Sequence, residues 1–484
     1  MKKFTLVALA MMVSASCFAQ TTQTTLWDGE DTNITSKEHA GFWADANPEL
    51  VNNPEKDGIN TSVHCLKFTI SNDNKVVKLP FREWITPSMN GSKRVSLMIK
   101  KGTNENVKVE LSDPTDGSDG YWKHQVVWYG GDDKWQKLVF DFTSNGDFDN
   151  PGIMSITAQT GDVNGEQTVY IDNIVIEDAP RINGKLFSEY NAENPITGNL
   201  TLTGAWMKGE SINADGDWTP NSYNDFEYFN QQASDGVTSI DMRGTVTKEV
   251  DIDQFFKNPN TIVYSNENYK HDNVVVDGKA ASLVLTDAKA FNAPYEFKAE
   301  SVKLTRDVRE GINSFVLPFA ATADELGADK VAIYKDCTLG DVANFETAES
   351  VVANTPFLTT GAKKVSELNF TNKDIVATPE SLGTDFIGVY APQTAEGKYG
   401  IDNNGNLHKG GEHATIAAFH AYLNVTNGTE PTRVAFNGST PTAINGVAAD
   451  KVANTAVYDL SGRRVYGKLQ KGLYIMNGKK VVVK

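Results

Sequence analysis

The residues best suited to chemistry form one short aromatic segment, residues 121–129. If this segment is a β-strand, alternate side chains lie on opposite faces. One face then carries Tyr121, Lys123, Gln125, Val127 and Tyr129, and the other carries Trp122, His124, Val126 and Trp128. A sugar ring has an apolar C–H face and a rim of hydroxyls, so a site for it needs exposed rings beside hydrogen-bonding groups.

The first of these faces mixes rings with amide and ammonium groups, so it is the predicted sugar-binding face. The candidate ligand-binding residues are Tyr121, Gln125 and Tyr129, followed by Trp122 and Trp84. Packing of the same rings in a core is an equally open interpretation, and the opposite assignment of faces would make Trp122, His124 and Trp128 the site. Trp135 starts a regular alternating strand and is predicted to be a core residue.

Motifs for catalysis are missing from the sequence. It contains no Gly-x-Ser-x-Gly elbow, His-Glu-x-x-His pair, phosphate loop or Cys-x-x-Cys pattern. His408, His413 and His420 are close in sequence, but without a second ligand motif we interpret them as incidental rather than as a metal site. Nothing among the 62 acidic residues selects a pair for glycoside hydrolysis. We therefore expect a protein that is not an enzyme.

The net charge of the chain narrows the class of partner. The 484 residues include 45 Lys and Arg against 62 Asp and Glu, which gives a net charge of −17. A protein this acidic lacks the basic surface that phosphate backbones require, so nucleic acid is not a predicted partner. A neutral ligand or a metal cation is easier to accommodate than a polyanion.

Residues 1–20 are typical of a signal peptide. Lys2 and Lys3 precede an apolar core, Phe4 to Val13, and small residues then lead to Ala19 as the predicted cleavage residue. The apolar core is too short to span a bilayer, and no later stretch has the length of a transmembrane helix. We therefore expect an exported protein. Cys65 and Cys337 lie far apart in the sequence and are predicted to be core thiols rather than a disulfide framework.

The elements that must position the aromatic segment are β-strands. Alternating apolar and polar residues recur in short runs bounded by Asn, Asp, Gly and Ser. In one such run, Val107, Val109 and Leu111 are expected to face a core. Helical periodicity is nearly absent, and one short helix is expected at Thr322 to Leu326. The predicted fold class is therefore all-β.

Breaks in the strand pattern predict the domain organisation. After the signal peptide, strands occupy residues 22–178 and stop before Pro180, because proline cannot continue a ladder. The later segments are an irregular β or short solenoid-like region at 181–300, a β-sandwich-like module at 301–440 and a small C-terminal β domain at 446–484.

Residues 22–178 resemble a known class of domain. Leu26-Trp27-Asp28-Gly29-Glu30-Asp31, the strand that starts at Trp135, and Tyr170-Ile171-Asp172-Asn173-Ile174 are similar to the galactose-binding-like jelly-roll carbohydrate-binding modules of bacterial glycan-degrading systems. The resemblance implies a jelly-roll β-sandwich that binds polysaccharide. It also implies a structural calcium ion, with Asp28 matching the acidic position of the opening motif, Asp172 that of the closing strand, and Glu30 as an alternative ligand.

The C-terminal residues resemble a second family. The segments 457–465, 471–475 and 478–484, which include Gly462-Arg463-Arg464, are similar to the C-terminal sorting domain of the Bacteroidetes type IX secretion system. This resemblance implies that residues 446–484 engage the secretion machinery and bring the chain to the outer-membrane surface or the extracellular space. Residues 301–440 also look like a β module of surface proteins in the same bacteria, with His420 in place of its usual arginine.

Together these observations predict a non-catalytic, cell-surface or secreted protein that binds polysaccharide through its first domain. Two other functions stay open at this point. The first is an adhesin that binds a host protein through the same scaffold. The second is a glycan-cleaving enzyme with its active site in residues 181–300.

Overall fold

The structure is a computed structural model, and two compact units make up the chain, residues 1–437 and 438–484. It describes residues 23–27, 48–56, 59–79, 93–112, 123–142, 153–208, 224–248, 250–337, 342–425, 430–437, 457–458, 464–465, 471–476 and 479–483. Within these ranges β-strands dominate and α2 (Asp225–Gln232) is the one α-helix. The predicted all-β fold class is therefore confirmed.

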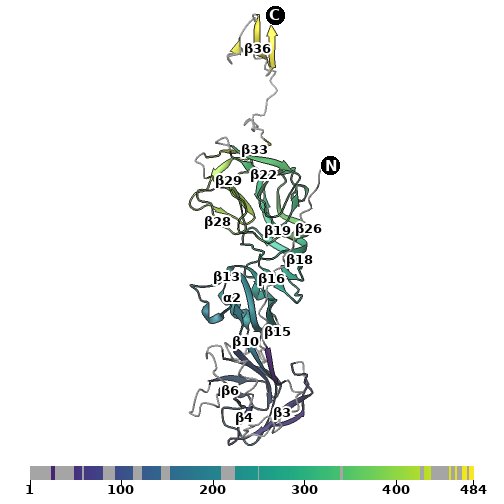
Figure 1. The fold of residues 1–484 in the computed structure, drawn as a ribbon, viewed down its shortest axis with the longest axis vertical. Helices are drawn as coiled ribbons and strands as arrows, with labels where there is room; N and C mark the ends of the chain where they lie inside the picture. Colours follow the sequence, from purple (N-terminus) through teal and green to yellow (C-terminus); the bar gives the residue numbers. More distant parts are fainter. Residues whose placement is uncertain are drawn as a thin grey trace, which may run out of the picture. The chain divides into compact units, whose positions relative to one another are not determined.

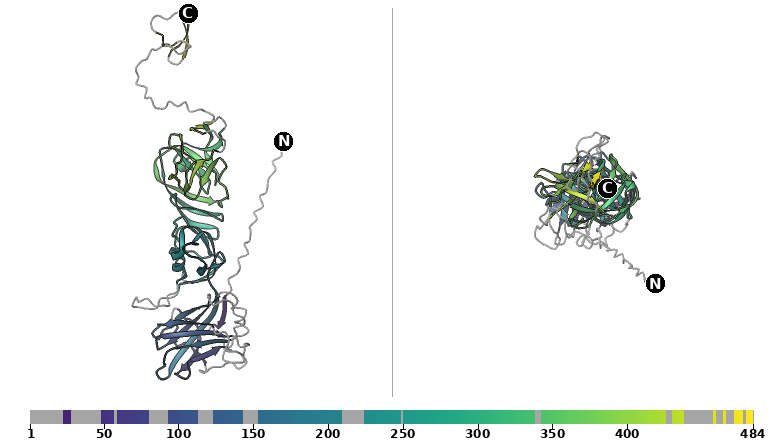
Figure 2. Two further views of the ribbon diagram at one scale, coloured as in Figure 1. Left: turned by 90° about the vertical axis from the view of Figure 1, so that its left-hand side faces the viewer. Right: turned by 90° about the horizontal axis from the view of Figure 1, so that it is seen from above.

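A β-sandwich forms the first part of the larger unit (Figures 1 and 2). Its first sheet has the order β2 (Glu49–Asn52), β3 (His64–Ile70), β10 (Gln167–Asp178), β5 (Lys93–Lys101) and β8 (Gln136–Asp141), with β1 (Gln23–Trp27) also paired to β10. Its second sheet has the order β4 (Val76–Leu79), β9 (Ile153–Thr157), β6 (Glu105–Ser112) and β7 (Lys123–Tyr129). All of these pairings are antiparallel.

The core of this sandwich follows from strand alternation. Val107, Val109 and Leu111 of β6 are fully buried, as the sequence predicted, and pack with residues of β3, β5 and β10. The residues between them on β6 are only partly buried. Removal of these alternating apolar side chains from water is what holds the two sheets face to face.

Parallel strands characterise the next part of the chain. β13 (Ile196–Met207), β14 (Ala233–Asp241), β16 (Ile262–Ser265) and β17 (Val274–Val276) pair in parallel, and β13 also pairs with β15 (Thr245–Lys248). β18 (Lys279–Thr286) and β19 (Phe297–Val308) form another parallel pair. The short elements beside them are β11 (Arg181–Ile182), β12 (Lys185–Leu186) and the 3₁₀ helices η3 (Phe187–Glu189) and η4 (Ile252–Phe255).

Buried asparagines support the turns between these parallel strands. The amide of Asn260 donates to Thr286 O and Lys289 O at 2.7 and 2.8 Å, and its oxygen accepts from Thr286 N. Asn273 bonds in the same way to Val284 N and O. These side chains satisfy backbone groups that have no ladder partner, because a buried unpaired amide or carbonyl costs free energy.

Helix α2 was not predicted from the sequence. Asn224 caps its N-terminus by accepting from Glu227 N, and acidic residues occupy its first turn. Phe226 and Phe229 lie on one side and pack against Trp206 of β13. The helix is therefore held by an aromatic cluster rather than by a long amphipathic pattern.

Asp225 at the start of α2 connects this parallel part to the first sandwich. Arg94 of β5 donates from both terminal nitrogens to the Asp225 carboxylate, at 2.9 and 3.1 Å. Met207 N donates to the same carboxylate, and Asp141 accepts from Arg94 Nε. Arg94 and Asp225 are both buried. In this joint each buried charge lies against an opposite charge and has hydrogen-bond partners. Buried ions are tolerated in proteins in this form.

The last part of the larger unit contains two further main sheets. One has the order β20 (Gly311–Phe315), β25 (Phe357–Ala362), β22 (Lys330–Asp336), β23 (Val342–Ala348) and β33 (Arg433–Phe436). The other has the order β27 (Phe386–Val389), β32 (His420–Leu423), β29 (Tyr399–Ile401) and β30 (Leu407–Lys409). Short pairs are formed by β21 (Ala321–Thr322) with β24 (Ser350–Val351) and by β28 (Gln393–Thr394) with β31 (Thr415–Ile416). The 3₁₀ helix η5 (Asp324–Leu326) lies where the sequence predicted a short helix.

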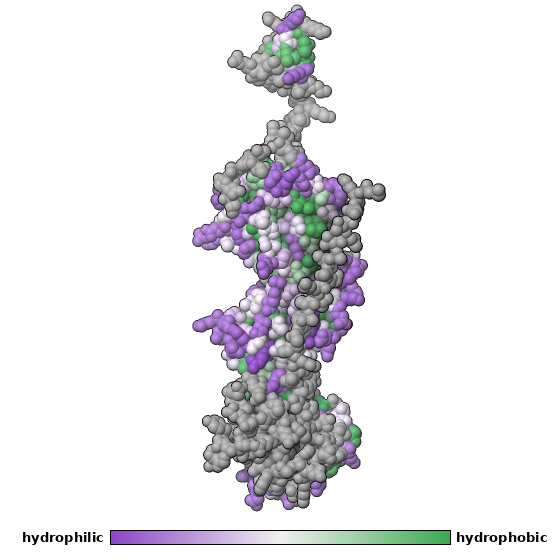
Figure 3. Space-filling model, in the orientation of Figure 1, coloured by the Kyte–Doolittle hydropathy of each residue, from purple (hydrophilic) through white to green (hydrophobic). Residues whose placement is uncertain are grey.

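The boundary expected at residue 300 falls inside β19. This strand pairs with β18 on one side and with β26 (Val365–Ile375) on the other, so it belongs to both neighbouring parts. One hydrophobic core runs from Ile262 to Phe419 across them. Hydrophilic residues cover much of the visible surface of these parts (Figure 3).

The smaller unit contains a four-stranded sheet of order β35 (Arg464–Val465), β34 (Val457–Tyr458), β36 (Gly472–Met476) and β37 (Lys479–Val483). Leu473 and Val482 are opposite each other on β36 and β37, and both are exposed. In the part of the chain that the structure describes, no helix has the length and apolar character needed to cross a membrane.

Candidate functional site

The pairing of β7 with β6 decides which face of β7 is available to a ligand. Gln125 lies opposite Val109 and Val127 lies opposite Val107, whose side chains are in the core. Val127 packs against that core, and Tyr129 belongs to it. The face that the sequence analysis selected for sugar binding is therefore turned toward the sandwich interior.

Tyr129 is a core residue instead of an exposed platform, which corrects the expectation for this ring. Its side chain is 0% exposed, and burial raises the pKa of its phenol to about 12. The phenol oxygen lies 2.9 Å from Lys101 O and 2.8 Å from Lys134 O, and it accepts from Lys101 N. These polar partners explain how a tyrosine hydroxyl is accommodated in the core. Trp135 is buried, as predicted.

The opposite side of β7 faces solvent. His124 is exposed, Val126 is 47% exposed and Trp128 is half-buried. On β6, Lys108 lies beside Val126 and Glu110 lies beside His124. Lys108 Nζ is 2.7 Å from a Glu110 carboxylate oxygen. We call these five residues the β7 face.

The β7 face combines the groups that a sugar site requires. The Trp128 indole and the Val126 side chain offer apolar surface, while His124 and the Lys108–Glu110 pair offer donors and acceptors. A Cβ on Gly130 would lie 3.2 Å from Trp128 Nε1, so this glycine lets the indole lie close to the chain. The sequence analysis named Trp128 and His124 as the reversed alternative. It did not include Lys108 and Glu110 in the site. Their alternation with Val107, Val109 and Leu111 was the signal that could have placed them on the outer face of the same sheet.

Several predicted site residues lie outside the described residues. They are Trp84, Tyr121 and Trp122 of the proposed sugar site, and Asp28 and Glu30 of the proposed calcium site. Residues 1–20, the predicted signal peptide, are also outside them. Gln125 is half-buried on the inward side of β7.

Asp172, the remaining predicted calcium ligand, is fully buried on β10. One of its carboxylate oxygens accepts from Asn60 Nδ2 at 2.9 Å, and the other accepts from Asn173 N at 2.7 Å. Each carboxylate oxygen has two lone pairs, so these bonds are compatible with a cation as a further partner. The described residues bring together no group of three or more His, Cys, Asp or Glu side chains that could hold a metal. Calcium binding therefore stays a prediction.

Comparisons with known proteins give similar solved structures but no family. No family model matches the chain, and no curated protein matches it. A variant of a family 29 carbohydrate-binding module is 12% identical, with 32% of this chain and 90% of that chain covered and a TM-score of 0.22. The CBM22-1 xylan-binding domain of Paenibacillus barcinonensis Xyn10C is 14% identical, with 32% and 91% covered and a TM-score of 0.22.

A third solved structure concerns the promiscuous specificity of carbohydrate-binding modules from the β-sandwich superfamily. It is 20% identical, with 31% of this chain and 60% of that chain covered and a TM-score of 0.23. These similar structures are thus carbohydrate-binding modules, and each is similar to about one third of the chain.

Proposed function

We propose that this protein is a non-catalytic glycan-binding protein that works outside the cell and holds polysaccharide on the β7 face. The observation that carries the proposal is the partly exposed Trp128 ring beside His124, Val126 and the Lys108–Glu110 pair. A ring of this kind stacks on the C–H face of a sugar, and the polar neighbours bond to its hydroxyls.

Two acids after the first sandwich, Asp225 and Asp241, are buried and therefore are not candidates for a general acid. Burial raises the pKa of the Asp225 carboxyl to about 6, a value that suits a general acid. However, Asp225 is 0% exposed and bound by Arg94, so it faces no substrate. Asp241 is likewise buried and paired with Arg243 at 2.6 Å.

A glycan array tests the proposal directly. The chain without its predicted signal peptide, residues 21–484, is applied to polysaccharides and to host proteins. Retention on glycans without release of new reducing ends is the expected result. Retention on a host protein alone would favour the adhesin, and new reducing ends would favour the enzyme.

Trp128→Ala is expected to weaken glycan retention about tenfold. Loss of one stacking platform removes apolar contact worth on the order of 1–2 kcal/mol at ~25 cal/mol per Å². The melting temperature should change little, because the ring is half-buried at the sandwich surface. Affinity electrophoresis measures the retention. Tyr228→Ala is the matched control, since Tyr228 is a 44% exposed ring on α2, away from the β7 face. Equal retention of wild type and Trp128→Ala would rule out this face.

Export and sorting form the second part of the proposal. The resemblance of residues 446–484 to a sorting domain supports surface display through the secretion machinery. Deleting these residues should leave a folded chain in the periplasm, because residues 438–484 form a compact unit separate from residues 1–437. Protease treatment of intact cells distinguishes displayed from retained chain. Surface display of the truncated chain would contradict the sorting role.

A further inference from the structure

The first sandwich has a hollow on the outer surface of the sheet that contains β10. Tyr170 of β10 projects from this surface, because its neighbours Val169 and Ile171 point into the core. Across the sheet Tyr170 lies between Lys67 of β3 and Lys100 of β5. The hollow has a volume of about 910 Å³ and is lined by Pro54, Glu55, Lys100, Gly102, Thr103, Asp133, Gln167, Thr168 and Tyr170. We call it the Tyr170 hollow.

The charged groups of this hollow are already paired with one another. Lys100 Nζ lies 3.2 Å from a Glu55 carboxylate oxygen and 2.9 Å from an Asp133 carboxylate oxygen. Lys134 Nζ lies 2.6 Å from the other Glu55 oxygen. Hydrogen bonds from Lys134 and Lys100 hold the pKa of Glu55 below its ordinary value. A charged ligand would have to displace these pairs, whereas hydroxyl groups can add to them, so a neutral ligand fits better.

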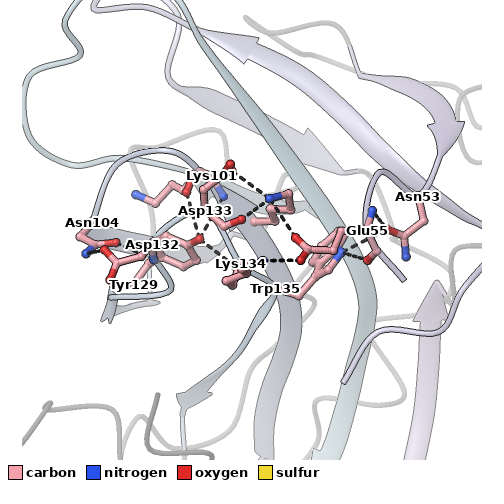
Figure 4. A network of polar contacts seen from close by, with 10 residues as sticks. Asn53, Glu55, Lys101, Asn104, Tyr129, Asp132, Asp133, Lys134 and Trp135 are labelled. Carbon is pink, nitrogen blue, oxygen red and sulfur yellow. Dashed lines mark hydrogen bonds and ion pairs between the residues drawn. The ribbon is translucent and has the colours of Figure 1, made fainter. Parts of the chain in front are cut away.

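Buried contacts hold in place the two segments that supply Glu55 and the Asp133–Lys134 pair of residues (Figure 4). Trp135 Nε1 donates to Glu55 O at 2.8 Å and to Asn53 Oδ1 at 3.1 Å. The hydroxyl of the buried Tyr129 lies at hydrogen-bond distance, 2.8 Å, from Lys134 O. Asp133 has a φ of 61°, in the left-handed region, which the surrounding contacts must maintain. The polar groups are therefore positioned before a ligand arrives, which lowers the entropic cost of binding.

The remaining lining groups supply what a sugar needs. Tyr170 is half-buried and lines the hollow. Thr103 Oγ1 donates to Gln167 Oε1 at 2.7 Å, which leaves the Gln167 amide nitrogen and the Thr103 oxygen to face further partners. A Cβ on Gly102 would meet no atom within 4 Å, so the backbone there is open.

We propose that the Tyr170 hollow is a second glycan site, which binds a neutral sugar unit by stacking on Tyr170 and by hydrogen bonds to Glu55, Asp133 and Gln167. This inference rests on the proposed glycan-binding function. The hollow and the β7 face lie on the outer surfaces of the two different sheets, so one protein molecule can hold two glycan chains at once. Such a molecule gains avidity and cross-links its polysaccharide.

Two readouts on the chain 21–484 test this second site. The first is affinity electrophoresis in gels that contain xylan, glucomannan or mixed-linkage β-glucan, with polygalacturonate as the charged comparison. The second is agglutination of beads coated with the retained polysaccharide, which needs two sites per particle. Retention of wild type should be stronger on a neutral polysaccharide than on polygalacturonate. Stronger retention on polygalacturonate that Tyr170→Ala abolishes would overturn the preference for a neutral sugar.

Tyr170→Ala should weaken retention about three- to tenfold and abolish agglutination, with an unchanged melting temperature. Tyr170→Phe keeps the ring and should remain within about twofold of wild type. Trp128→Ala should also abolish agglutination, and the double variant should not be retained. A dimer with one site per chain is distinguished by this pattern, because the variant that leaves that single site intact would then still agglutinate the beads.

The outcomes separate the second site from the proposed function. If Tyr170→Ala retains and agglutinates like wild type while Trp128→Ala loses retention, the Tyr170 hollow is not a site and the β7 face is. If only Tyr170→Ala loses retention, the hollow binds glycan and the β7 face does not. Absence of wild-type retention on every polysaccharide would overturn both.

Discussion

Arg94→Met is expected to lower the free energy of unfolding by about 3–5 kcal/mol, the usual cost of leaving one partner of a buried ion pair alone. Asp225 is fully buried, and Arg94 is the cation that binds both of its carboxylate oxygens. Methionine fills similar space without supplying a charge. Because the pair joins β5 to α2, calorimetry should show the loss in the transition that includes the first sandwich and the parallel strands.

The same variant should have a characteristic pH dependence. Burial raises the pKa of the Asp225 carboxyl to about 6, from an ordinary value of 3.8, against the lowering effect of Arg94. A raised pKa means that the folded state binds the proton more readily, so stability from this group is present below pH 3.8 and is lost as pH rises through about 6. Removing Arg94 should raise this pKa further. The difference in free energy of unfolding between wild type and Arg94→Met should therefore be small near pH 4 and should grow toward pH 8.

A double variant provides the control for this joint. Arg94→Met with Asp225→Asn removes the buried charge altogether and keeps an oxygen that accepts from Met207 N. It should recover a large part of the lost stability at pH 8, since no uncompensated ion then remains buried. If Arg94→Met alone melts like wild type at pH 8, the Arg94–Asp225 pair contributes nothing to the stability of the fold.

Trp135→Ala is expected to cost about 3–5 kcal/mol, as large-to-small changes in a core do. The side chain is 1% exposed, and its indole N–H donates to Asn53 Oδ1 and Glu55 O. Alanine leaves a cavity and removes the indole donor from both acceptors, of which Asn53 Oδ1 still accepts from Glu55 N at 3.0 Å. Thermal unfolding followed by calorimetry measures the effect. Glycan retention through the Tyr170 hollow should fall as well, because Glu55 loses its support.

Two variants make this result specific. Trp135→Phe keeps a ring in the same place but loses the indole donor and some apolar volume, so we expect a loss of roughly 1–3 kcal/mol. Trp128→Ala removes a half-buried ring and should stay close to wild type in stability. A stable Trp135→Ala together with an unfolded Trp128→Ala would mean that the core and surface roles of the two rings are exchanged.

Local sequence pattern was enough to predict the fold class and part of the core. Alternation placed Val107, Val109 and Leu111 inside the sandwich, and the structure buries all three. Trp135 was also predicted to be buried, and it is, but its indole lies against Asn53 and Glu55 rather than among the residues that Val107, Val109 and Leu111 contact. The prediction for β6 succeeds because alternation in a strand depends on two-residue periodicity, which neighbouring residues reveal by themselves. Helix α2 was missed because tertiary packing of Phe226 and Phe229 on Trp206 stabilises it, rather than a long periodic pattern.

The choice between the two faces of β7 was beyond the sequence alone. Both faces carry aromatic side chains, so alternation separates two sets of residues without saying which set is inside. That depends on the register with β6, which puts Gln125 opposite Val109 and leaves Trp128 opposite Asn106. A shift of one residue in that register would exchange the two faces.

The sequence by itself determined that the chain is an all-β protein with alternating strands, and which residues share a face of each strand. Only the tertiary structure decided that Tyr129 is core, that Trp128 faces solvent, and that Glu55, Lys100 and Tyr170 line one hollow. The physical reason is distance along the chain. Periodicity acts between residues two positions apart, whereas these sites form from residues separated by tens of positions, which only the pairing and packing of whole sheets bring together.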